Sequence, residues 1–100
     1  MKIPKKLKIF GYDWTVRYKK EDEKSGGSFD WKKKEIVLDT EYGEQESIFI
    51  HELMEAILVE LHFRFYGQEG NMPYTFHFDH EGLCKFHKAF FQALKDNKII

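Results

Sequence analysis

Hydrophobic residues change their spacing once along this chain, near Glu44, and this change limits the folds open to it. Before Glu44, aromatic and β-branched residues alternate with polar ones, most clearly between Tyr12 and Tyr18. A period of two is typical of strands with one buried face. After Glu44, apolar residues recur every three or four positions, as they do in amphipathic helices. This order predicts an α+β domain in which strands precede helices.

Three to four short strands are expected before the change of spacing. The segment 7–18 is β-type, and the turn at Gly11 would split it into two strands. The segments 28–31 and 35–39 would pair as a hairpin around the lysine turn 32–34. The stretch 21–28, which is charged and then Gly-rich, is expected to be a loop. We therefore expect a small antiparallel sheet of three to four strands.

Two helices are expected after the strands. The first would run from Glu44 to about Phe63, with apolar residues at helical spacing on one face. The stretch 67–73 contains glycines and a proline and would interrupt it. The second helix would begin at Asp79, a favourable N-cap residue, and run to about Lys95. Both helices would cover one face of the sheet, and the 100 residues would form a single domain, 1–100.

The composition excludes several classes of protein. Apolar residues make up 42% of the chain and aromatic residues 17%, which is enough for a compact core. A net charge of −1 and the lack of any long apolar stretch give no reason to expect a nucleic acid or a membrane as partner. Cys84 is the only cysteine, so no internal disulfide is expected. We therefore expect a soluble, cytoplasmic protein.

Residues suited to metal chemistry lie inside the first predicted helix. His51 and Glu55 are four positions apart, so they share one face of a helix and can point at a common ion. Glu52 lies about 100° round the axis, where it can reach a water beside that ion. The pattern His-Glu-x-x-Glu differs in one residue from the His-Glu-x-x-His of zinc peptidases. Taken alone, it is a weak motif, because acidic residues are common on helices.

A catalytic zinc site needs a third protein ligand, and five residues are candidates. His80 is the first choice, because it would begin the second helix as the chain returns past the first. His77, in the extended segment before it, is the second choice. His62 lies about 10 Å beyond Glu55 along the helix axis, too far to share its ion. The remaining candidates, which would lie deeper in the second helix, are Cys84 and His87.

Ligation by His51, Glu55 and His80 would give two imidazoles and one carboxylate, the composition of His₂Glu zinc sites. Glu52 would then be the catalytic residue, acting as general base for peptide hydrolysis. The metal would be Zn²⁺, and the partner a peptide or protein substrate.

The helix segment 48–58 resembles the active-site helix of small zincin-like metallopeptidases of phages and bacteria, akin to the ImmA/IrrE group. The segments 3–16 and 27–38 are similar to the strands that precede this helix in such proteins, and 79–97 is similar to their closing helix. The resemblance implies a minimal zincin-like domain in the cytoplasm of a bacterial or phage-infected host cell. It also implies that His51 and Glu55 are helix ligands, Glu52 the general base and His80 the third ligand. At position 55 the chain has glutamate where the peptidase group has histidine.

Two other functions compete with a peptidase. The first is an inactive metal-binding or zincin-derived interaction protein, such as a phage modulator of a host protein complex. The second is a nucleic-acid binder that uses two lysine clusters, one at the N-terminus and one at 32–34. A net charge near zero disfavours the second.

Overall fold

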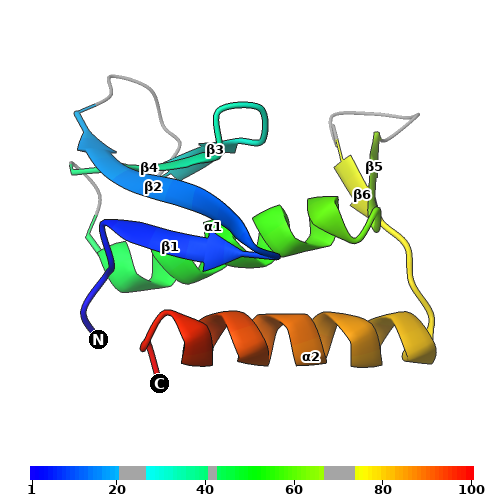
Figure 1. The fold of residues 1–100 in the computed structure, drawn as a ribbon. Helices are drawn as coiled ribbons and strands as arrows, with labels where there is room; N and C mark the ends of the chain where they lie inside the picture. Colours follow the sequence, from blue (N-terminus) through cyan, green and yellow to red (C-terminus); the bar gives the residue numbers. More distant parts are fainter. Residues whose placement is uncertain (21–26, 41–42, 67–73) are drawn as a thin grey trace.

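The structure is a computed structural model that describes residues 1–20, 27–40, 43–66 and 74–100. The first four elements are strands: β1 (Lys6–Ile9), β2 (Tyr12–Lys19), β3 (Gly27–Asp30) and β4 (Glu35–Asp39). They are followed by α1 (Gln45–Glu60), the short strands β5 (Arg64–Tyr66) and β6 (Tyr74–Phe76), and α2 (His80–Asp96) (Figure 1). The predicted α+β class, a small sheet followed by two helices, is confirmed.

The four strands form one sheet in the order β1-β2-β4-β3. The predicted hairpin β3–β4 is antiparallel, and β1 and β2, the two strands expected on either side of Gly11, also pair antiparallel. The sheet is mixed rather than purely antiparallel, because β2 and β4 pair in parallel. This arrangement gives β4 an inner position, which suits its three consecutive buried residues Ile36, Val37 and Leu38. β3 lies at the edge of the sheet.

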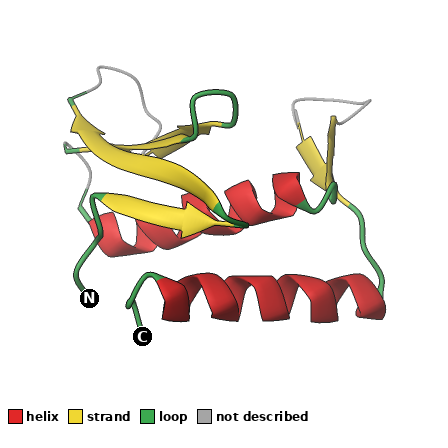
Figure 2. Cartoon of the chain, in the orientation of Figure 1, coloured by secondary structure: helices red, strands yellow, loops and turns green. Residues whose placement is uncertain are grey.

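Both helices cover the same face of the sheet, as predicted. Buried residues of the strands, including Trp14 and Leu38, form one core cluster with Phe49 and Leu53 of α1 and Ala93 of α2. α1 packs against β3 and β4, and α2 packs against α1 and β1. Figure 2 shows α1 behind the sheet in this view and α2 below both. The middle of α1 is therefore fixed against the edge of the sheet.

α1 ends three residues earlier than the sequence predicts. His62 adopts the left-handed conformation, with φ 62°, which ends the helix. The Phe63 N–H donates to the Leu58 carbonyl at 2.9 Å, and the His62 N–H to the Val59 carbonyl at 3.0 Å. These two bonds are those of a Schellman motif, which satisfies the last carbonyls of a helix.

α2 begins where the sequence predicts. Asp79 is its N-cap, and the Asp79 carboxylate accepts the Gly82 N–H at 2.9 Å. The link before α2 contains a feature that the sequence did not reveal, the hairpin of β5 and β6. The loop predicted at 21–28 lies largely outside the described residues, as does the break predicted at 67–73.

None of the helices that the structure describes is long and apolar enough to cross a membrane.

Candidate metal site

The three motif residues of α1 form one cluster. One ligand atom from each of His51, Glu52 and Glu55 lies within 4.8 Å of the other two. The described residues contain no other group of three or more histidine, cysteine or acidic residues placed this closely. The helical repeat produces this arrangement, since residues one turn apart lie one above the other. An imidazole and two carboxylates are donors that suit a divalent ion such as Zn²⁺, so the cluster could hold one.

His51 and Glu55 are in direct contact, at a distance slightly shorter than that between two ligands of one ion. The His51 Nε2 and Glu55 Oε2 atoms are 2.9 Å apart. Two ligand atoms bound to one tetrahedral Zn²⁺ ion at its usual bond lengths are about 3.3 Å apart. The two ligand atoms would have to move apart by a few tenths of an ångström to admit the ion. The side chain of His51 is 68% exposed, so the site is open to solvent.

Glu52 differs from its two neighbours in being buried, with 6% of its surface exposed. The pKa of Glu52 is raised to about 7, mainly by burial and also by the negative charge of Glu55, whereas His51 and Arg64 act in the opposite direction. The carboxyl group of Glu52 can therefore change its protonation near neutral pH.

The edge strand β3 lies directly against the cluster, and Gly27 makes this approach possible. A Cβ atom on Gly27 would lie 2.7 Å from Ile48 Cγ2, 3.0 Å from the Val37 carbonyl oxygen and 3.4 Å from Glu52 Cγ. Any side chain at position 27 would push α1 away from the sheet. Gly27 thus holds the cluster within reach of the sheet edge.

Arg64 of β5 adds a positive charge beside the cluster. The Arg64 guanidinium lies 3.5 Å from Glu55 Oε1, on the carboxylate oxygen that His51 does not contact. It also lies over the Phe29 ring, 5.0 Å from the ring centroid. A partner on the far oxygen fixes the orientation of a carboxylate ligand, as hydrogen bonds outside the ligand shell do in known metal sites.

His80, the predicted third ligand, is not part of this cluster. His80 is exposed at the first residue of α2, and its Nδ1 atom lies 3.8 Å from Cys84 Sγ. Gly82, in the first turn of α2, packs near Phe63, which follows the end of α1. α2 therefore begins beyond the end of α1, whereas the cluster lies at the middle of that helix (Figure 1). The role of His80 as a ligand stays a prediction.

The other candidates also lie outside the cluster and have local contacts of their own. His62 ends α1, and the His77 ring packs against Phe65 at 5.6 Å between centroids. The exposed His87 ring lies 6.4 Å from the Phe91 ring.

Sequence reasoning missed two residues of the site, Gly27 and Arg64. A glycine at the start of a predicted strand is a recognised sign of close backbone approach, so Gly27 could have been found. Nothing in the spacing of Arg64 connects it with Glu55, because the contact depends on how the chain turns after α1.

Comparisons with protein-family models, with curated proteins and with solved structures each gave no match for this chain.

Proposed function

We propose that the cluster binds Zn²⁺ through His51 and Glu55 and that the chain is a small zincin-like metallopeptidase. The observation that carries this proposal is the cluster of His51, Glu52 and Glu55, whose ligand atoms lie within 4.8 Å of one another, with Glu52 buried. Imidazole and carboxylate one helical turn apart are a common pair of zinc ligands. Whether His80 completes the ligand set is decided by the variants described below.

Glu52 is the general base in this proposal. When bound, a divalent ion polarises a peptide carbonyl and makes a neighbouring water more acidic. The Glu52 carboxylate accepts the proton of the attacking water and then donates it to the leaving nitrogen. Arg64 keeps the Glu55 carboxylate turned toward His51.

The free edge of β3 supports a peptide as the substrate. Among the described residues β3 pairs on one side alone, with β4, and its face at Gly27 lies against Glu52 of the cluster. An extended peptide can add to such an edge through main-chain hydrogen bonds. A carbonyl of that peptide would then lie beside Glu52.

Hydrolysis of fluorescently labelled, unfolded casein by the zinc-loaded protein tests this proposal. Glu52→Gln should reduce the rate at least about 100-fold while zinc content is unchanged, because a positioned base contributes about that much. Glu46→Gln, at an exposed position in the first turn of the same helix, is the matched control and should keep the native rate. Equal rates for the native protein and Glu52→Gln would refute the assignment of Glu52.

One observation favours a different function for the same cluster. The contacts of Glu55 with both His51 and Arg64 can balance its charge without any ion. The chain would then be a non-catalytic interaction protein. It would take up no zinc at micromolar concentrations and would have no activity on casein.

A further inference from the structure

A cavity opens at the C-terminal end of α1, one turn beyond Glu55. Its volume is about 360 Å³, which lies at the small end of the range for ligand pockets. The turn after β3 forms one side of the cavity and β5 the other. The residues that line it are Trp31, Val59, Glu60, His62, Arg64 and Phe65.

Two large aromatic side chains form walls of this pocket and stay in contact with solvent. Trp31 and Phe65 are each 47% exposed. They come from separate elements, the turn after β3 and the strand β5. Exposed aromatic rings that border one cavity are typical of binding surfaces, where a ligand covers them.

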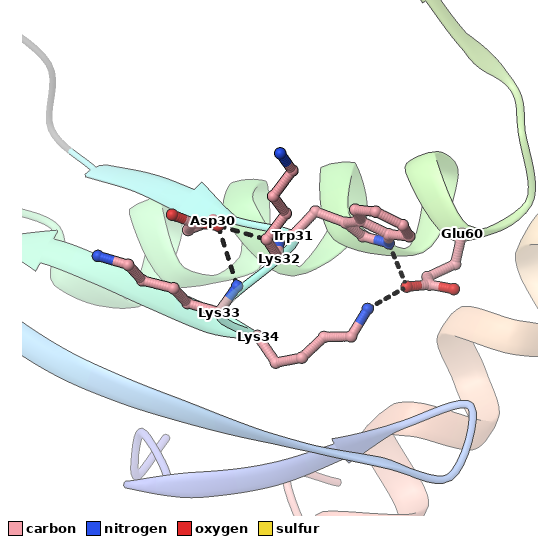
Figure 3. A network of polar contacts seen from close by, with 6 residues as sticks. All are labelled: Asp30, Trp31, Lys32, Lys33, Lys34 and Glu60. Carbon is pink, nitrogen blue, oxygen red and sulfur yellow. Dashed lines mark hydrogen bonds and ion pairs between the residues drawn. The ribbon is translucent and has the colours of Figure 1, made fainter.

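The Trp31 wall is held in place by polar contacts (Figure 3). The Trp31 Nε1–H donates to Glu60 Oε1 at 2.6 Å, and the Lys34 ammonium pairs with the same oxygen at 3.1 Å. The Lys34 ammonium also lies 4.3 Å from the centroid of the Trp31 ring. An indole fixed in this way loses little conformational freedom when a ligand binds.

The charges around the pocket are already balanced by partners within the chain. Lys34 pairs with Glu60, and Arg64 contacts Glu55 and covers the Phe29 ring. A charged ligand group would therefore lose its water without gaining a free opposite charge. An uncharged apolar or aromatic group suits these walls better.

Arg64 connects the pocket with the candidate metal site. Arg64 lines the pocket and contacts Glu55, and Trp31 directly follows the edge strand β3. Along α1, the pocket at Val59 and Glu60 lies about 10 Å from the centre of the cluster, given a rise of 1.5 Å per residue. An extended peptide covers that distance in about three residues.

We propose that this pocket binds a large uncharged side chain, preferably aromatic, of a peptide that lies along β3. The side chain belongs to a residue about three positions from the peptide bond beside Glu52. The identification of the ligand as a substrate rests on the proposed peptidase function, whereas the pocket and its preference for aromatic groups do not require a metal.

Binding of short blocked peptides, followed by ¹⁵N NMR, tests the pocket. The probes are four tripeptides, acetyl-Gly-X-Gly-amide, in which X is Phe, Ala, Lys or Asp. The Phe peptide should shift the Trp31 indole N–H signal and bind at least tenfold more tightly than each of the others. The indole signal of Trp14, which is fully buried, is the internal reference and should not move. Equal binding of the four peptides, or a preference for Lys or Asp, would overturn the proposal.

Variants locate the binding and separate it from the metal. Phe65→Ala should weaken binding of the Phe peptide about tenfold, and Phe91→Ala, on an equally exposed aromatic residue of α2, should not. Trp31→Leu, followed through backbone signals of β5, provides a second test if Phe65→Ala fails to fold. All titrations are made with chelator and again with zinc. Preferential binding of the Phe peptide in chelator, without any zinc uptake, would support the pocket and refute the peptidase. Zinc uptake without a preference among the peptides would refute the pocket and leave the peptidase supported.

Discussion

Glu52 is the residue whose environment departs furthest from that of an ordinary glutamate. Glu52 belongs to the His-Glu-x-x-Glu motif of α1, yet β3 and neighbouring side chains shield it from solvent. The unfolded chain offers no such burial, so its carboxyl group there has the ordinary pKa of about 4.5. The difference between the two states links protonation of Glu52 to folding.

The metal-free protein should lose stability as the pH rises through 7. Because the pKa of Glu52 is about 7 in the folded state, the folded chain keeps a proton that the unfolded chain releases near pH 4.5. The contribution is fully present below pH 4.5 and is lost as the pH rises through 7, about 3 kcal/mol in total. Urea unfolding in the presence of a chelator at several pH values measures this contribution. It is the unfolding free energy of the native protein minus that of Glu52→Gln. A difference that stays constant between pH 4.5 and 8 would contradict the assignment.

His62 should be replaceable by glycine with a gain in stability. His62 has φ 62°, a conformation that costs a non-glycine residue about 1–2 kcal/mol and costs glycine nothing. Part of this gain is lost to the greater freedom of glycine in the unfolded chain, so we expect about 0.5–1 kcal/mol. Lys98→Gly, at the equivalent left-handed position after α2, should show a similar gain. Zinc affinity should not change in either variant, and a weaker affinity for His62→Gly would make His62 a ligand.

At the scale of elements, the contact between β3 and α1 determines where the cluster lies. Ile48 and Glu52 are one turn apart on α1, and both face Gly27. The edge strand can come this close to the helix because position 27 has no side chain. The same contact brings β3 beside Glu52, the proposed general base.

Gly27→Ala should destabilise the protein by about 1–3 kcal/mol, the usual cost of overpacking. The added methyl group would meet Ile48 Cγ2 at 2.7 Å. In an Ile48→Ala background that atom is missing, so the cost of Gly27→Ala should be smaller. A double-mutant cycle of unfolding free energies measures the coupling. An identical cost in both backgrounds would show that the helix does not press on this strand.

The spacing of residues along the sequence predicted the helices and most strands well. It predicted the contacts between distant segments poorly. The cluster of His51, Glu52 and Glu55 could be predicted because it depends on the repeat of one helix. The parallel pairing of β2 with β4 and the contact of Arg64 with Glu55 could not, since both join segments that no local spacing relates. The placement of His80 depends on where the chain turns between the helices, and that turn includes an unpredicted hairpin.

At the scale of the whole molecule, a four-stranded sheet and two helices hold one candidate metal cluster and one aromatic pocket along the same side of α1. The cluster lies at the middle of this helix and the pocket at its C-terminal end. The edge strand β3 runs beside both. This arrangement suits a peptide that is bound in extended form.

Zinc should stabilise the whole fold if the cluster binds it only in the folded state. At a free zinc concentration 100 times Kd, the expected gain is about 2.7 kcal/mol. Thermal unfolding with zinc and with chelator measures the gain. His51→Ala should abolish it. A gain that persists in His51→Ala would place the ion elsewhere.

Isothermal titration of the metal-free protein with Zn²⁺ tests the central claim most directly. We predict one ion per chain with a Kd in the micromolar range or below, and loss of binding in both His51→Ala and Glu55→Ala. His87→Ala, an exposed histidine of α2, is the control and should bind as the native protein does, while His80→Ala decides whether that residue is a ligand. Absence of zinc uptake by the native protein, or unchanged uptake by His51→Ala, would contradict the account.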